Sequence, residues 1–343
     1  MKLQSSQNHI RNQEQKRKIK IGNTRFISTT SAYDTYWRFA SLRQAIFLRR
    51  VQGCAPPWTD DEVLSRYRFT NVYRASDRVS QYLIRRVLYN GEQSPSEVFF
   101  RTVLFKLFNR IDTWEKLTEA VGPPSWREFK FDWYATSLDR LLERGDRIYS
   151  AAYIMPSPAF GSHRKHRNHL RLIEHMMKDS APQRLAHVRS LREAYNILRS
   201  YPSLGDFLAF QLAIDLNYSE LLDFPEMEFV VAGPGARDGI SKCFADTGGF
   251  TEVDIIRMMS ERAEAEFTRL GLEFHTLWGR PLQLVDCQNL FCELSKYARV
   301  VHPNIPGESG RMRIKQRFIV KQDPLPQWYP PKWGLTPTLT SVW

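Results

Sequence analysis

Residues 193–244 have the sequence EAYNILRSYPSLGDFLAFQLAIDLNYSELLDFPEMEFVVAGPGARDGISKCF, and this stretch decides the fold. Its first part predicts a helix, which Pro202 and Gly205 end because proline cannot continue a helix and glycine tolerates turn geometry. Asp206 then predicts the N-cap of a second helix. Two interpretations fit this pattern: an ordinary pair of core helices, or a hairpin that holds a nucleic-acid phosphate at a helix N-terminus.

The hairpin itself, LRSYPSLGDFLA at residues 198–209, resembles that of the helix-hairpin-helix DNA glycosylase superfamily. The usual motif is a leucine followed by Pro-Gly-hydrophobic-Gly, and Ser203 replaces its first glycine here. Superfamily members that cut the DNA strand carry a lysine where this chain has Phe207. The resemblance therefore implies an enzyme without a lysine Schiff base. No clean Val-Asp-x-His motif follows in the window where the superfamily places its catalytic aspartate.

Three further segments carry a closer resemblance, in the order 69–78, 233–236 and 288–297. Together they are similar to the α-glutamyl/putrescinyl-thymine pyrophosphorylase family, a glycosylase-derived clade that acts on modified DNA bases. Some bacterial relatives in that clade are antiviral DNA glycosylases, which remove glucosylated hydroxymethylcytosine from phage DNA. The resemblance spans about residues 30–300.

The composition favours a polyanionic partner. The 343 residues carry a formal net charge of +12, although a basic protein without such a partner has the same composition. The four cysteines show no CxxC or Cys/His ligand spacing, so we expect reduced core residues in a cytoplasmic protein, with no iron–sulfur cluster, metal or other cofactor. No signal peptide or membrane-length apolar run is visible, and we expect a monomer with no membrane partner.

The chain divides into three predicted regions. Residues 1–30 are expected to be a basic flexible arm, residues 31–302 a glycosylase-like helical domain, and residues 303–343 a proline-rich basic C-terminal tail. Within the domain, residues 161–190 form a basic, histidine-rich insertion. A metal site there is disfavoured because Arg164, Lys165 and Arg167 would repel a cation. A helix facing DNA and a solvated helix face both remain open.

Two polar rows at helical spacing predict a pocket. Residues 74, 77, 78 and 81 fall at i, i+3, i+4 and i+7, and residues 286, 289, 293 and 296 form a comparable row later in the chain. The second row combines two carboxylates, an amide and an amine, which are suited to acid–base chemistry. The alternatives are a surface network of ion pairs and a solvated helix face. The family resemblance falls on both rows and favours a pocket wall.

The expected roles fall into three groups. The candidate catalytic carboxylates are Asp286, Glu293 and Asp238. The expected base-binding residues are Asn71, Tyr73, Arg74, Asp77, Arg78, Gln288, Asn289, Lys296 and Tyr297. The expected contacts to the DNA backbone are Ser203, Gly205, Asp206, Gly233, Gly235, Ala236 and Arg237. The glycine-rich segment 233–239 would let backbone N–H groups approach an anion, or is simply a turn; it is no P-loop, and we find none elsewhere.

These observations lead to one expected architecture and three hypotheses of function. We expect a mainly α, helix-hairpin-helix DNA glycosylase-like fold, in which two helical lobes flank a cleft for double-stranded DNA containing modified bases. The leading hypothesis is a monofunctional DNA glycosylase, an antiviral hydrolase of N-glycosidic bonds. It would excise a flipped, bulky modified pyrimidine such as glucosylated hydroxymethylcytosine, with a carboxylate stabilising the oxocarbenium charge. The alternatives are a pyrophosphorylase-type enzyme that adds an amine to pyrophosphorylated hydroxymethyluracil in DNA, and a non-catalytic DNA-binding module.

Overall fold

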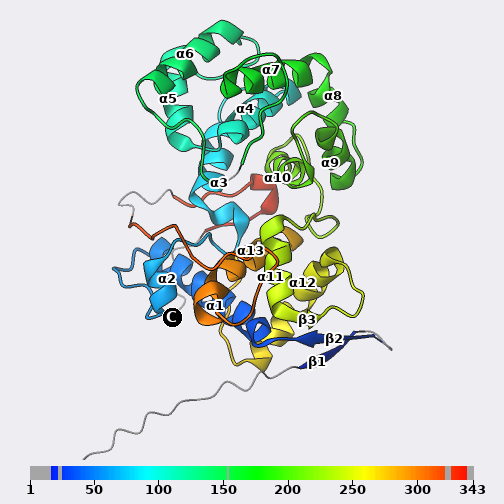
Figure 1. The fold of residues 1–343 in the computed structure, drawn as a ribbon. Helices are drawn as coiled ribbons and strands as arrows, with labels where there is room; N and C mark the ends of the chain where they lie inside the picture. Colours follow the sequence, from blue (N-terminus) through cyan, green and yellow to red (C-terminus); the bar gives the residue numbers. More distant parts are fainter. Residues whose placement is uncertain (1–16, 22–24, 153, 321–325, 338–343) are drawn as a thin grey trace, which may run out of the picture.

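The fold is mainly helical, as the sequence predicts. The computed structural model describes residues 17–21, 25–152, 154–320 and 326–337, and these form thirteen α-helices and three short strands. Figure 1 shows two halves stacked along the long axis of the molecule. We call the half with α4–α10 the distal half, and the half with the strands, α1, α2 and α11–α13 the basal half. One continuous hydrophobic core runs through both.

The basal half is built around α13 (Leu284–Val301), which packs on α1 (Ser31–Val51), α11 (Pro234–Cys243) and α12 (Glu252–Arg269). Its apolar stripe meets the aromatic face of α1, where the Tyr36 ring lies 4.7 Å from that of Phe291. Capping residues and periodicity predict one helix from about residue 251 to 270 and another over residues 283–301. The bounds of α12 and α13 agree with these to within two residues. The reason is local: a capping box at Thr251 and Asp254 fixes the start of α12.

A small antiparallel sheet replaces part of the expected N-terminal arm. Strands β1 (Lys18–Ile21), β2 (Arg25–Thr29) and β3 (Phe244–Asp246) lie in the order β1-β2-β3. The cause is the alternation of lysine and isoleucine, because every second side chain of a strand points to the same face. Ile19 and Ile27 are thereby buried against the core. Residues 1–16 and 22–24 of the expected arm lie outside the described residues.

The distal half contains the other long helices. These are α4 (Pro95–Phe108), α5 (Ile111–Val121), α6 (Phe131–Glu143), α7 (Lys165–Lys178), α8 (Ala181–Leu185), α9 (Leu191–Arg199) and α10 (Asp206–Asn217). Helix α7 falls in the expected histidine-rich insertion, yet it packs on α4 and α6 as part of the core. His166 Nε2 lies 2.7 Å from Asp139 Oδ1, and His169 bonds to the Tyr149 hydroxyl and the Pro156 carbonyl. The buried face of α7 is therefore committed to internal contacts.

Residues 74–82 differ from the single helix that their spacing predicts. A 3₁₀ turn, η1 (Arg74–Ser76), is followed by extended backbone at Asp77 and then by the short helix α3 (Arg78–Tyr82). The π-helical segment η2 (Leu83–Leu88) continues from α3. The helix is interrupted at Asp77. Its carboxylate accepts a hydrogen bond from Asn71 N at 2.7 Å, and this contact holds the residue in an extended conformation. Arg74 and Gln81 therefore do not share one helix face.

The proline-rich C-terminal segment lies on the body of the protein over its described residues. Next to α2 (Glu62–Arg66), Phe318 N donates to Arg66 O at 3.1 Å, and Arg68 N donates to Gln316 O at 3.0 Å. The 3₁₀ turn η3 (Pro331–Trp333), red in Figure 1, then sits in the middle of the molecule beside α10. The segment thus contacts both halves, where the sequence left open whether it lies on the body or on DNA.

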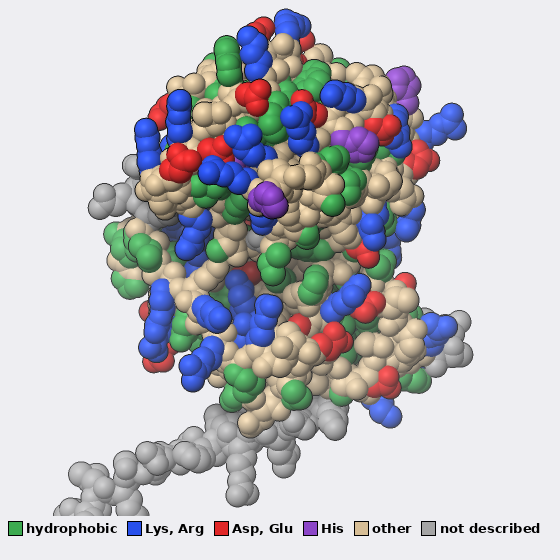
Figure 2. Space-filling view, turned by 45° about the horizontal axis from the view of Figure 1, so that its top comes forward, with side chains coloured by type: hydrophobic (Ala, Val, Ile, Leu, Met, Phe, Trp, Pro, Cys, Tyr) green, Lys and Arg blue, Asp and Glu red, His purple; other side chains and the backbone are tan. Residues whose placement is uncertain are grey.

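Two surface properties bear on partners. Lys and Arg side chains gather on both sides of a hollow that crosses the middle of one face (Figure 2). Among the described helices, none combines the length and apolar character needed to cross a membrane. Of the four cysteines, which all have free thiols, Cys54 is exposed, contrary to the expectation of four core residues.

Candidate functional site

Three residues of the polar row on α13 contact the 66–71 loop. Glu293 Oε2 accepts a hydrogen bond from Thr70 N at 3.0 Å, and Asn289 Nδ2 donates to Asn71 O at 3.0 Å. Lys296 pairs with Glu293 at 2.6 Å on the same helix. These three expected site residues are brought together, and their shared contact is the backbone of one loop.

Arg43 on α1 holds the same loop from its other side. Its Nε donates to Thr70 O at 2.9 Å, and its Nη2 donates to the side-chain oxygen of Asn71. Helical spacing predicts a basic, solvent-facing row of Arg43, Arg49 and Arg50 on this helix, but Arg43 is only 7% exposed in the structure. Burial lowers the pKa of Arg43 to about 10, against the opposing effect of the nearby Asp77 and Glu293 carboxylates. The guanidinium is thus a buried cation surrounded by loop backbone.

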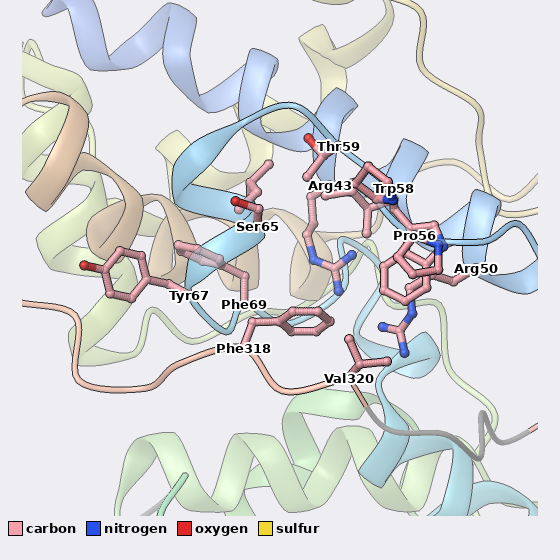
Figure 3. Close-up of a pocket in the computed structure, with 13 residues that line it drawn as sticks. Arg43, Arg50, Pro56, Trp58, Thr59, Ser65, Tyr67, Phe69, Phe318 and Val320 are labelled. Carbon is pink, nitrogen blue, oxygen red and sulfur yellow. The ribbon is translucent and has the colours of Figure 1, made fainter.

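A pocket of about 210 Å³ opens in front of this loop. Figure 3 shows its walls, which come from α1, from the segment that leads into α2, from the 66–71 loop and from the C-terminal segment. The lining residues are Arg43, Ile46, Arg50, Pro56, Pro57, Trp58, Thr59, Leu64, Ser65, Tyr67, Phe69, Phe318 and Val320. We call it the Arg43 pocket. Aromatic rings and two guanidinium groups dominate its surface.

Asp286, the first candidate catalytic carboxylate, is buried at the start of α13. Its Oδ1 accepts from Arg74 N at 2.8 Å and its Oδ2 from Gln283 N at 3.0 Å, completing a capping box with Gln283. Burial, and secondarily the charge of Glu226, raise the pKa of Asp286 to about 7. Both carboxylate oxygens are therefore committed to backbone N–H groups.

Asp238 on α11, another candidate carboxylate, joins α13 to the C-terminal segment. Ser295 Oγ donates to its Oδ2, and Ser309 N donates to its Oδ1 at 2.7 Å. Burial acts to raise the pKa of Asp238, but these hydrogen bonds outweigh it and the pKa lies below its ordinary value. The three candidate carboxylates thus bind three different parts of the chain. Asp286 caps the start of α13, Glu293 holds the 66–71 loop, and Asp238 connects α13 with the C-terminal segment.

Arg74 forms the polar centre between the two halves. Its Nη2 lies 2.6 Å from Asp215 Oδ1 on α10, and its Nε donates to Gln211 Oε1 at 2.9 Å. Lys106 on α4 lies 2.6 Å from the other oxygen of Asp215. All four side chains are buried. A buried pair of this kind stabilises little by itself, but removing one partner leaves an uncompensated charge and typically costs about 3–5 kcal/mol.

The remaining expected base-binding residues lie on separate elements. The Tyr73 hydroxyl donates to Arg280 O at 2.9 Å, and the Tyr297 hydroxyl donates to Asp61 Oδ2 at 2.6 Å. Gln288 is buried on α13, whereas Arg78 is half-buried at the start of α3. These positions and the Arg43 pocket do not form one continuous wall.

The α9–α10 hairpin and the start of α11 lie against each other. Ser203 takes the left-handed backbone conformation (φ 66°) that the usual motif gives to glycine, and Gly205 is the N-cap of α10. A Cβ atom at Gly233 would lie 2.6 Å from the Phe207 ring. The two groups of expected DNA-backbone contacts are thus neighbours in space.

Among the expected contacts to the DNA backbone, Arg237 is exposed and Ala236 is buried. Asp206 pairs with Arg199 at 2.5 Å on the surface of the hairpin. Gly235 gives close packing, because a Cβ atom there would lie 2.4 Å from Cys292 Sγ on α13. The structure therefore accounts for this glycine by helix packing, and its contact with DNA stays a prediction.

Comparison with known proteins decides the family. Residues 30–307 match the family described as "5-hmdU DNA kinase, helical domain". The chain belongs to this family. A 5-hmdU DNA kinase of Bacillus phage SP10 is 31% identical over 288 residues, which cover 77% of this chain and 44% of that protein. The chain thus spans less than half the length of this relative. No solved structure matches the chain.

Membership in this family corrects the leading hypothesis of function. Both the family and the relative are described as kinases, so the expectation of a DNA glycosylase, a hydrolase of N-glycosidic bonds, is wrong. Neither comparison supports the pyrophosphorylase alternative or a preference for glucosylated hydroxymethylcytosine. The comparisons support only the coarser part of the predicted resemblance, namely a family whose name refers to a modified pyrimidine in DNA.

The Arg43 pocket is the feature that sequence reasoning missed. Its helix and loop residues lie within the matched range 30–307, whereas Phe318 and Val320 lie beyond it. One signal was present: Arg43 and Arg50 are seven residues apart and so share a helix face. The pattern alone could not show that the C-terminal segment folds back to cover that face.

Proposed function

We propose that this chain binds DNA that carries 5-hydroxymethyldeoxyuridine and holds the modified nucleoside while its hydroxymethyl group is phosphorylated. The observation that carries the proposal is the family match over residues 30–307, supported by the relative named as a 5-hmdU DNA kinase. The net charge of +12 and the basic side chains around the hollow in Figure 2 suit a DNA partner.

The nucleotide donor needs a site of its own. A P-loop requires a Gly-Lys dipeptide followed by Ser or Thr, and none of the 17 glycines in this sequence precedes a lysine. The match to the phage kinase covers only 44% of that protein. We therefore assign recognition of the modified DNA to this chain, and we assign the nucleotide site to a kinase part that acts together with it.

We place the DNA backbone along the hairpin and the start of α11. Gly205 and Gly233 are the N-caps of α10 and α11, so the free N–H groups of two helix ends lie close together. The side chain of Arg237 is exposed beside them. A phosphate there would be bound by backbone N–H groups and a cation, which position DNA without reading its sequence.

The test is a binding titration with three duplexes of one sequence that contain thymine, 5-hydroxymethyluracil or 5-hydroxymethylcytosine at one position. We expect the tightest binding to the 5-hydroxymethyluracil duplex, with affinity falling as salt rises because phosphate contacts release counterions. Equal binding of all three duplexes would exclude recognition of the modified base. A parallel incubation with γ-labelled ATP tests where the nucleotide site lies. If this chain alone transfers label to DNA, the nucleotide site belongs to this chain and not to a separate kinase part.

A pair of matched variants tests the backbone contact. Replacing Arg237 with Met should weaken binding to all three duplexes by a similar factor of about 3–10 and lower the salt dependence by about one phosphate contact. Arg140 is exposed on α6 in the distal half, and the Arg140→Met variant makes the same change of charge there. If the Arg140 variant loses as much affinity, the effect is one of net charge, and the proposed DNA path is wrong.

A further inference from the structure

The Arg43 pocket contains two cations and, among its described lining residues, no carboxylate. Arg43 and Arg50 project into it from one face of α1, as Figure 3 shows. Trp58, Phe69 and Phe318 supply flat apolar walls. The Asp77 and Glu293 carboxylates lie near Arg43 but do not line the pocket, and Arg50 has no carboxylate partner among the described residues. Cations placed between aromatic rings suit a ligand that has both an anionic group and a flat ring.

Arg43 offers an unused donor to this space. Its side chain is only 7% exposed, and two of its nitrogens already bond to the 66–71 loop. The third nitrogen, Nη1, is buried without a hydrogen-bond partner among the described residues. Leaving a buried donor unpaired costs about 1–3 kcal/mol, so a bound acceptor at this position recovers that free energy. The guanidinium is therefore fixed in place, with one edge ready for a ligand.

Arg50 is positioned by stacking. Its guanidinium carbon lies 5.1 Å from the centre of the Trp58 ring and 5.9 Å from that of Phe318. No ion pair of Arg50 occurs within the described part of the chain. A planar guanidinium restrained by rings loses less rotational freedom when it binds an anion than a mobile side chain does. The pocket thus has a second cation, which is preorganised and has no ion-pair partner among the residues that the structure describes.

We propose that the Arg43 pocket binds a ligand that combines one pyrimidine ring with one phosphate group, as a pyrimidine nucleotide does. Arg43 Nη1 and Arg50 would bind the phosphate, since guanidinium groups match its oxygens. The ring would stack on the aromatic walls. The volume of about 210 Å³ lies below the roughly 300–1,000 Å³ of typical ligand pockets and fits one ring better than a dinucleotide.

The wall that would hold the ring is itself held rigidly. Phe69 belongs to the loop fixed by Glu293 and Arg43, and Phe318 is tied to Arg66 through its backbone N–H group. Glu293 is then a positioning residue of the pocket rather than a group that touches the ligand. Phe318 lies beyond the residues 30–307 that match the family.

Two sources of such a ligand share this chemistry. One is a free nucleotide; the other is a phosphorylated base that has left the stack of a DNA duplex, and this second source rests on the proposed function. The experiment has two arms. Calorimetric titration with thymidine 5′-monophosphate, thymidine and inorganic phosphate tests the free ligand. Titration with duplexes that contain thymine or 5-phosphomethyluracil at one position tests DNA.

The variant that reports on the pocket is Arg50→Met, because the Arg50 side chain makes no hydrogen bond or ion pair within the described part of the chain, and the backbone bonds of Arg50 are kept in the variant. Its control is Arg38→Met, which removes a charge from an exposed position of the same helix, five residues before Arg43. We expect wild type to prefer the phosphorylated ligand at least tenfold in one arm. Arg50→Met should abolish that preference, and Arg38→Met should retain it.

The proposal is overturned if neither arm shows a preference that depends on Arg50. It is also overturned if inorganic phosphate binds as tightly as thymidine 5′-monophosphate, because the aromatic walls would then have no role. A preference in the free-ligand arm alone identifies the nucleotide as the occupant. The titration with free ligands does not depend on whether the chain prefers 5-hydroxymethyluracil DNA. The proposed function can therefore fail while this inference holds, and the two failures give different results.

Discussion

Asp77 illustrates how a single side chain changes role between sequence and structure. Its spacing suggested a base-binding helix face, but the carboxylate is turned inward to accept a hydrogen bond from Asn71 N. Burial raises the pKa of Asp77 to about 7, although the Asn71 hydrogen bond and the charge of Arg43 act to lower it. In the structure Asp77 therefore holds the 66–71 loop, and its contact with a base stays a prediction.

This raised pKa predicts a pH-dependent stability. The folded state binds the proton of Asp77 more tightly than the unfolded chain, whose carboxyl titrates near its ordinary value of about 3.9. The stabilisation is therefore complete below about pH 4 and is lost as pH rises through about 7. An Asp77→Asn variant should gain stability relative to wild type between pH 4 and 8, by about 4 kcal/mol at most.

Urea unfolding at several pH values measures this difference. Asp60 is exposed, and Asp60→Asn is the control that removes the same charge without a buried partner. The prediction is wrong if wild type and the Asp77 variant lose stability in parallel as the pH rises.

At the scale of elements, the close contact between α11 and α13 depends on glycines of α11, and Gly239 is the most tightly packed of them. A Cβ atom at Gly239 would lie 2.1 Å from the carbonyl oxygen of Phe291, so the two helix backbones nearly touch there. The glycine-rich sequence of α11 was interpreted as a possible anion-binding loop. In the structure its clearest role is to let α11 approach α13, whose residues hold the 66–71 loop.

Replacing Gly239 with Ala should therefore force the helices apart and destabilise the fold by about 3 kcal/mol or more. Gly205 provides the comparison, because a Cβ atom there meets nothing within 4 Å and its φ is −68°. The Gly205→Ala variant should lose no more than about 1 kcal/mol. Thermal or urea unfolding of the two variants measures this contrast, and similar losses for both would contradict the close-packing argument.

At the scale of the whole molecule, the end of the described chain joins the two halves. Lys332 Nζ donates to Ser219 O at 2.7 Å and also to Leu222 O, just after α10. Trp333 packs against the Tyr218 ring of the same region, and the Arg280 guanidinium of the basal half lies 3.8 Å above it. The segment also carries the pocket residue Phe318. Its packing therefore supports both the joint between the halves and the proposed ligand site.

We expect Trp333→Ala to lower the free energy of unfolding by about 2–3 kcal/mol, less than a fully buried tryptophan would lose. Limited proteolysis should also cut the C-terminal segment faster in this variant. Trp133 on α6 is 56% exposed, and Trp133→Ala should stay within about 0.5 kcal/mol of wild type. Equal stability of the two variants would show that the segment does not hold the halves together.

The sequence by itself determined the mainly helical class and the bounds of several helices. Helical periodicity and capping residues are local, so the mainly α class and the bounds of helices such as α10, α12 and α13 follow from them. Net charge is a property of composition, and it favoured a polyanionic partner. The resemblance correctly indicated a family named for a modified pyrimidine in DNA, but it predicted a glycosylase. Comparison with known proteins shows a kinase family instead.

Only the tertiary structure decided what each polar side chain does. Asp286, Glu293 and Asp238 are equivalent as carboxylates in a sequence, and their separate partners come from segments far away in the chain. The Arg43 pocket likewise needs α1, the 66–71 loop and the C-terminal segment to meet. Periodicity states which residues share a face, but it carries no information about which distant backbone will cover that face. The location of a buried, unpaired donor is therefore a property of the folded chain alone.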